Sequence, residues 1–191
     1  MRVVPSVLIA ALLLSASPRD ARSADAIHPG AVELRMRASV AHETLEYDDE
    51  DVGSRTDAEA GLAAGLFLTR WFELGVGFGY NYTKFDPEEG TGSWDRSSIV
   101  LAPEIVLNAP SAGPIVPYVS GGGGVVFYTG DWAGDKTGMI LPRVEGGIRW
   151  FAAEGAAIHF AGVYSRWTNR DGDEDAAATH YAFIAGISIF P

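Results

Sequence analysis

Polar and apolar side chains alternate with a period of two along most of this chain, and this alternation constrains the fold more than any other feature. Over residues 72–83, the sequence FELGVGFGYNYT places aliphatic and aromatic side chains on one face, and polar residues and glycines on the other. The same rule holds over 32–41 and 140–150. Such alternation is typical of β-strands with one polar and one apolar face. Glycines scattered through the apolar segments disfavour helices there.

The alternation predicts eight strands, at 31–44, 56–69, 71–84, 96–108, 115–129, 138–151, 156–168 and 180–190. Short turns are expected at 69–70, 108–114 and 152–155, and longer acidic loops at 45–55, 85–95, 130–137 and 169–179. An even strand number with short turns on one side and long loops on the other is the layout of an outer-membrane barrel. We therefore predict an all-β fold, an eight-stranded antiparallel transmembrane β-barrel that forms one domain over 27–191.

Residues 1–26 have the organisation of a secretory signal peptide. A basic start at Arg2 precedes an apolar stretch over 3–16, and Ala24-Asp25-Ala26 provides a small-residue cleavage site. The apolar stretch is shorter than the ~20 residues that a membrane-spanning helix needs. We predict cleavage after Ala26 and export of the chain to the cell outer membrane.

The composition excludes several classes of protein. The 191 residues carry 25 acidic and 14 basic side chains, a formal net charge of −11. Nucleic acid is therefore not an expected partner, because its phosphates must be neutralised by basic side chains. The chain has no cysteine, which excludes a disulfide scaffold and thiolate metal sites. We expect no metal and no cofactor.

The apolar face could point to lipid, as in a membrane barrel, or to the interior, as in a soluble lipocalin-like barrel. Three observations favour lipid. The only two lysines, Lys84 and Lys136, fall at a strand end and in a loop. Glycines share the charged face, which suits a crowded bore. Aromatic residues gather near both strand ends, as in the two interfacial girdles of a membrane barrel. They are Trp71, Phe72, Tyr118, Trp150, Phe151 and Phe190 toward the short turns, and Tyr80, Tyr82, Tyr128, Trp132, Trp167 and Tyr181 toward the long loops.

The polar face would then line the bore with four acidic and four basic side chains. These are Glu33, Arg35, Arg37, Glu73, Glu104, Arg143, Glu145 and Arg149. Buried ions need partners, and the arginine fork can hold two carboxylates. Because the interior of an eight-stranded barrel is only just wide enough for side chains, we predict an interior charge network that plugs the bore. A charged constriction that gates ions is the alternative.

The segment Pro117-Tyr118-Val119-Ser120, followed by glycines at 121–124, resembles the Pro-Tyr-x-Gly-rich fifth strand of a known family. This is the family of small eight-stranded outer-membrane β-barrels typified by the OmpA transmembrane domain and OmpX. The resemblance implies short turns in the periplasm, long loops outside the cell and a charged bore. We expect a monomer, inserted by the barrel-insertion machinery among outer-membrane lipids and lipopolysaccharide, with acidic loops available to an extracellular ligand.

Prolines depart from the family pattern. Members of the family usually end in Phe, whereas here Pro191 occupies the terminal aromatic slot and Phe190 precedes it. Pro103 and Pro142 fall inside predicted strands. Since proline has no N–H to donate to the ladder, we expect bulges or local unpairing at both positions.

Lipid A deacylation, as in PagL-like barrels, would require a His and a Ser two residues apart on one strand face, with an acid to orient the His. None of the four histidines, at 28, 42, 159 and 180, is followed two residues later by Ser. His159 and Ser165 are six residues apart, about 20 Å along a strand. We predict that His159 is a bore residue bonded to the Glu/Arg network and that the chain is not an enzyme.

The acidic run Asp171-Gly172-Asp173-Glu174-Asp175 begins like a calcium loop, but Ala182 stands at the twelfth position, where a bidentate Glu is needed. The acidic loops are therefore expected to be solvated surface. The role that fits these patterns is non-enzymatic, either envelope-stabilising or in surface interaction. A narrow porin-like channel for ions or small solutes and a PagL-like lipid A-modifying hydrolase are the alternatives.

Overall fold

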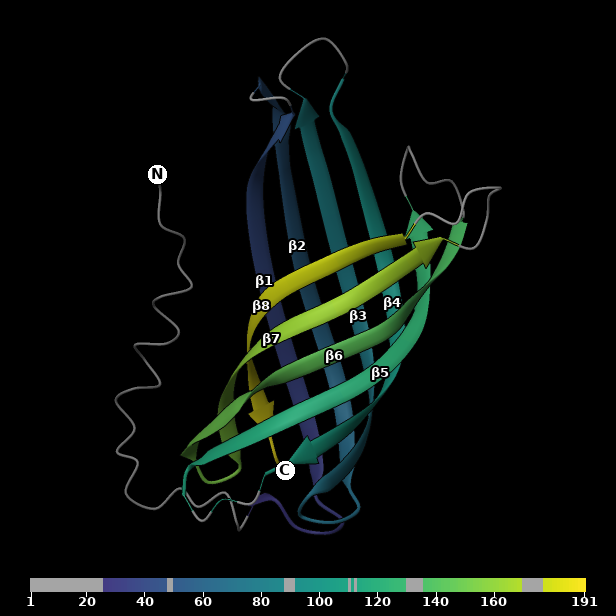
Figure 1. The fold of residues 1–191 in the computed structure, drawn as a ribbon. Helices are drawn as coiled ribbons and strands as arrows, with labels where there is room; N and C mark the ends of the chain where they lie inside the picture. Colours follow the sequence, from purple (N-terminus) through teal and green to yellow (C-terminus); the bar gives the residue numbers. More distant parts are fainter. Residues whose placement is uncertain are drawn as a thin grey trace.

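The computed structural model describes residues 26–47, 50–87, 92–109, 111, 113–129, 136–169 and 177–191. They form a closed antiparallel barrel in which each strand pairs with the next and β8 returns to β1 (Figure 1). The strands are β1 (Val32–Tyr47), β2 (Glu50–Phe67), β3 (Phe72–Pro87), β4 (Trp94–Asn108), β5 (Ile115–Thr129), β6 (Lys136–Ala153), β7 (Ala156–Asn169) and β8 (Ala177–Ile189). In this described part of the chain, no helix has the length and apolarity needed to cross a membrane.

The predicted fold class and strand number are confirmed. The predicted loop at 45–55 is wrong, because β1 and β2 continue as a paired hairpin to Tyr47 and Glu50, with a register shift after Leu45. Backbone hydrogen bonds between strands do not require apolar side chains, so the ladder extends past the point where the alternation fades. Figure 1 shows the long-loop ends of β1 to β4 rising above the rest of the barrel.

Several predictions fall outside the described residues. These are residues 1–25 of the signal peptide predicted over 1–26, the centres of the acidic loops at 48–49, 88–91, 130–135 and 170–176, and Trp132 with them. The signal peptide and the behaviour of the acidic loops therefore stay predictions.

The outer surface of the barrel is apolar and the bore is charged, as expected for a membrane barrel and opposite to a lipocalin. Leu62, Phe78 and Leu101 are outward-facing neighbours on β2, β3 and β4, and each is about half exposed. Arg35 and Arg149 face inward and are 1% and 0% exposed. An apolar belt of this extent is stable only against lipid or another apolar partner.

The predicted aromatic girdles are only partly correct. Trp71, Tyr80 and Tyr181 are exposed on the outside, whereas others lie in the bore: Tyr118, Tyr128, Phe151 and Phe190 are buried, and Trp167 packs against a buried apolar cluster. Strand parity decides this outcome, because alternate residues face opposite sides even at strand ends. At the short-turn end, Phe151 and Phe190 belong to an apolar cluster that also contains Ala26, Ile27, Ala31, Phe67, Val116 and Ala157.

The two strand prolines disturb the ladder, as predicted. Pairing between β4 and β5 lapses at Ala102 and Pro103. Pro142 follows a cis peptide bond, and the β6–β7 register shifts between Ile140 and Arg143.

Barrel closure is uneven. β1 and β8 form only five residue pairs, which end at Ala38 and Ala185, whereas β8 pairs with β7 along its whole length from Ala177. The upper part of β8 therefore diverges from β1, as Figure 1 shows.

Candidate functional site

The lower layer of charges crosses the bore around Arg149 of β6. Its Nε lies 3.1 Å from Glu33 Oε1, and its Nη2 lies 2.7 Å from Glu33 Oε2 and 3.0 Å from Glu73 Oε2. Its Nη1 donates to Asn108 Oδ1. Arg35 Nη2 lies 3.3 Å from Glu33 and 3.2 Å from Glu73. One guanidinium thus joins β1, β3, β4 and β6 across the bore.

Aromatic rings flank the Arg149 guanidinium. Its Cζ lies 4.6 Å from the Tyr118 ring centroid and 5.9 Å from the Phe67 centroid. Cation–π attraction of this kind strengthens where water is excluded, and the Arg149, Glu33 and Glu73 side chains are 0% exposed. Tyr118, which was expected in the girdle, therefore contributes to the interior.

A second layer lies nearer the long loops. Arg37 Nη1 lies 3.2 Å from Glu145 Oε2, and Arg143 Nη2 lies 3.2 Å from Glu59 Oε1. Arg37 Nε lies 3.7 Å from the same Glu59 oxygen. The Tyr118 hydroxyl donates to Glu145 Oε1 at 2.6 Å and so links this layer to the lower one.

All eight residues of the predicted interior set lie in the bore, and the structure brings them into one connected set, in which Arg35 also pairs with Glu104 at 3.2 Å. Glu59, Asn108 and Tyr118 were missed by the sequence analysis. The sequence AEAGLAAG around Glu59 has small residues on both faces, so its alternation does not reveal which side is inward.

Two inward-facing glycines create the space that the lower layer needs. A Cβ at Gly65 would overlap the Glu73 carboxylate, and a Cβ at Gly186 would overlap the His159 ring and the Met36 carbonyl oxygen. Because real atoms do not approach so closely, these glycines permit Glu73 and His159 to occupy the bore.

His159 lies in the bore, as predicted, but the predicted bond to the network is wrong. Its side chain is 0% exposed, and neither ring nitrogen has a hydrogen-bond partner among the described residues. A buried polar group without a partner carries a desolvation cost.

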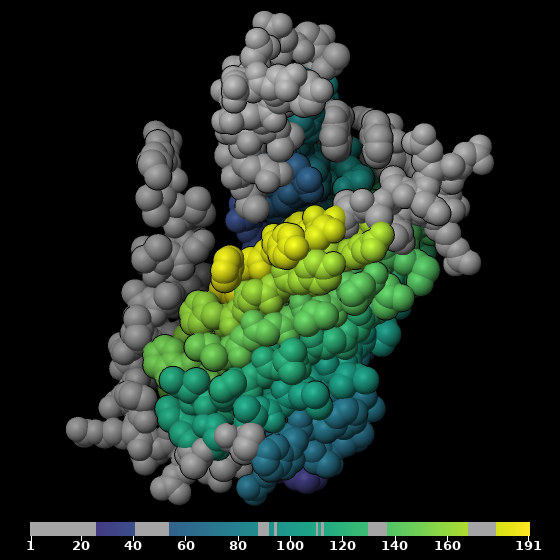
Figure 2. Space-filling model, in the orientation of Figure 1, coloured from purple at the N-terminus to yellow at the C-terminus, as the bar shows by residue number. Residues whose placement is uncertain are grey.

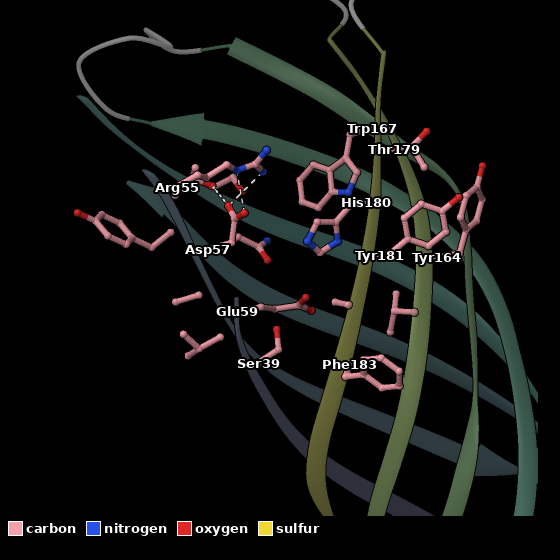
Figure 3. Close-up of a pocket in the computed structure, with 18 of the residues that line it drawn as sticks. Ser39, Arg55, Asp57, Glu59, Tyr164, Trp167, Thr179, His180, Tyr181 and Phe183 are labelled. Carbon is pink, nitrogen blue, oxygen red and sulfur yellow. Dashed lines mark hydrogen bonds and ion pairs between the residues drawn. The ribbon is translucent and has the colours of Figure 1, made fainter. Parts of the chain in front are cut away.

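Above the charged layers, the bore opens into a cavity of about 1020 Å³ at the long-loop end (Figure 3). Figure 3 shows Asp57 and Glu59 facing His180 and Trp167 across this space. The Asp57 carboxylate pairs with Arg55 Nε at 2.8 Å and accepts a hydrogen bond from Thr83 Oγ1 at 2.6 Å.

One Ser–His pair emerges from the fold and was missed because it spans two strands. Ser165 of β7 lies opposite His180 of β8 in the strand register. A comparison of residues within one strand does not pair residues across the β7–β8 hairpin. Ser165 is 0% exposed and accepts a hydrogen bond from Trp167 Nε1 at 2.8 Å. No hydrogen bond between Ser165 and His180 is formed in the described structure, and no three His, Asp or Glu side chains there are grouped to hold a metal ion.

No protein-family model and no curated protein matches the chain. Solved structures do match in fold. Neisserial surface protein A (NspA) is 13% identical, with a TM-score of 0.55 over 84% of this chain and 96% of that one. Outer membrane protein OprG from Pseudomonas aeruginosa is 12% identical, with a TM-score of 0.51 over 86% and 95%. The outer membrane enzyme PagL is 18% identical, with a TM-score of 0.50 over 80% and 97%.

These similarities define the class: the chain has the fold of the small eight-stranded outer-membrane β-barrels. Together with the apolar outer belt, this fold places the chain in the lipids of the outer membrane. The similar structures include both a surface protein and an enzyme, so the likeness shows the fold alone.

Proposed function

We propose that the chain is a non-enzymatic outer-membrane protein whose bore is plugged by its Glu/Arg network and whose role is envelope-stabilising or in surface interaction. The observation that carries this proposal is the contact of Arg149 with both Glu33 and Glu73, all three side chains being 0% exposed. Ions and solutes need a hydrated path, and the full burial of these three side chains supports a layer that water does not cross.

The surroundings of the network support the same role. Below it, the apolar cluster that includes Phe67, Phe151 and Phe190 fills the short-turn end of the bore. The network joins strands that are not neighbours in the ladder, such as β1 and β6. Removing one partner of a buried ion pair strongly destabilises a fold, because the other charge stays buried without compensation. The interior therefore acts as a charged core that holds the barrel wall together.

A narrow channel is the main alternative, because the upper half of the bore is hollow. Conductance across planar bilayers tests it with the mature barrel refolded in lipid. We expect no conductance steps from the native chain. Discrete openings whose size changes in Arg143→Gln or Glu145→Gln, and not in the surface variant Lys84→Gln, would overturn the proposed plug.

A hydrolase is the second alternative, since PagL shares the fold and Ser165 lies opposite His180. Mass spectrometry of lipid A from cells that express the native chain or Ser165→Ala tests this activity. We expect identical acylation with either chain and without the protein. Loss of an acyl chain that depends on Ser165 would contradict the non-enzymatic assignment.

A further inference from the structure

The barrel wall is open on one side at the long-loop end, between residues 39–47 of β1 and 177–184 of β8. We call this opening the lateral notch. Continuing the β1–β8 register would place Val40 opposite Phe183, but in the described strands no pairing exists beyond Ala38 and Ala185. Figure 2 shows β8 as the upper margin of the front face of the barrel.

Apolar side chains at the rim of the lateral notch are more exposed than those of the rest of the lipid-facing belt. Phe183, Val40 and Tyr181 are 88%, 76% and 74% exposed, more than any other large apolar side chain in the described structure. Tyr181 packs on Tyr164 with ring centroids 5.4 Å apart. The rim therefore offers an apolar surface that no strand covers.

The cavity above the charge network continues through the lateral notch to the outside of the barrel. Its lining includes inward-facing residues such as Asp57 and His180, and outward-facing residues such as Tyr164 and Phe183. Figure 3 shows His180 and Tyr181 on opposite sides of β8, both against this space. The cavity thus joins a polar interior to the lipid-facing surface.

Among the described residues, one cation in this cavity has no acidic partner. In the described structure, Arg96 of β4 lines the cavity and forms no ion pair; its Cζ lies 5.1 Å from the Tyr128 ring centroid. The cavity carboxylates are already paired, Asp57 with Arg55 and Glu59 with Arg143. An anionic group that enters the cavity therefore finds a guanidinium free to donate two hydrogen bonds to it.

We propose that the lateral notch and its cavity bind a single-chain amphiphile with a carboxylate or phosphate head group. The head group lies at Arg96, and the acyl chain leaves through the lateral notch across Phe183, Val40 and Tyr181. The cavity volume is at the upper end of the ~300–1,000 Å³ typical of ligand pockets. A strand from a second copy would pair with the β8 edge but would leave Arg96 without an anion. The proposal does not depend on the plug below the cavity.

Photocrosslinking in phosphatidylcholine nanodiscs tests this site. The probe is a 16-carbon fatty acid with a diazirine at the chain end, and mass spectrometry locates the label. We expect saturable labelling near Phe183 and Tyr181. Hexadecyl phosphate and palmitate should compete, and their ranking identifies the preferred head group, whereas hexadecanol should compete poorly. Arg96→Gln should raise the half-saturating concentration about tenfold or more, because a charge-assisted hydrogen bond is lost. The control Arg166→Gln removes an exposed arginine outside the cavity lining and should not change labelling.

Because the chain has no cysteine, the lateral notch can be blocked at one engineered thiol. Val40→Cys modified with a bulky maleimide should lose the label, and modified Leu62→Cys, on the lipid-facing side of β2, should keep it. Non-saturable labelling spread over all strands, or equal labelling in Arg96→Gln and Arg166→Gln, would overturn the proposal. Thiol-linked pairs of Val40→Cys barrels in place of labelling would overturn it too, and would show that a second copy occupies the lateral notch.

Discussion

Arg149 donates two hydrogen bonds to Glu33, from Nε to Oε1 at 3.1 Å and from Nη2 to Oε2 at 2.7 Å, although the residues are 116 positions apart in the chain. This is the bidentate geometry in which a guanidinium and a carboxylate bind most strongly. The pair joins β1 to β6 through the middle of the barrel. Both side chains are 0% exposed, so removal of either one should change the stability of the barrel strongly.

We expect Arg149→Gln to lower the free energy of unfolding by about 3–5 kcal/mol, because two buried carboxylates, Glu33 and Glu73, would then share Arg35 as their one remaining cation in the described structure. Urea unfolding of the barrel in lipid vesicles, followed by tryptophan fluorescence, measures the change. Lys84→Gln breaks an ion pair whose partners are each 45% exposed and should cost less than about 1 kcal/mol. Equal effects of the two variants would contradict a structural role for the buried pair.

Gly65→Ala should destabilise the barrel by about 1–3 kcal/mol, because its Cβ would overlap the Glu73 carboxylate. Gly146→Ala is the matched control, since a Cβ there meets nothing within 4 Å. In the Glu73→Ala background the cost of Gly65→Ala should largely disappear, because all three nearest atoms belong to the Glu73 side chain. A double-mutant cycle in the same urea assay tests this coupling, and strict additivity would refute it.

His159→Leu should leave stability unchanged or raise it. The His159 ring is fully buried, and its two nitrogens have no partner in the described structure, so an apolar side chain of similar size removes a desolvation cost. Heat-modifiability on a gel measures the melting midpoint. A clear fall in that midpoint would mean that the ring makes a polar interaction essential to the bore.

Leu101→Arg should destabilise the bilayer-embedded barrel by about 2–4 kcal/mol, because it places a charge in the lipid-facing belt. Ser97→Arg, outward-facing on the same strand but nearer the long loops, should cost about 0–1 kcal/mol. Refolding yields in vesicles and urea titrations compare the two. The reverse order would overturn the assignment of the membrane belt.

Much of the fold could be predicted because barrel strands carry their own local pattern. The alternation over Phe72 to Thr83 specified both the strand and its two faces, and the structure confirms them. The hairpin at 45–55 was predicted as a loop because backbone pairing continues there without apolar alternation. The charged members of the bore could be named, but not their partners, since Glu33 and Arg149 meet only when the barrel closes.

The sequence by itself determined the strand count and the alternation of a polar and an apolar face along the strands, because a period of two puts successive residues on opposite faces. Tertiary structure alone decided which ions pair across the bore, and that β1 and β8 separate after Ala38 and Ala185. Those outcomes depend on the stagger with which the last strand meets the first. The stagger is fixed only when the barrel closes, so the sequence pattern of a single strand does not specify it.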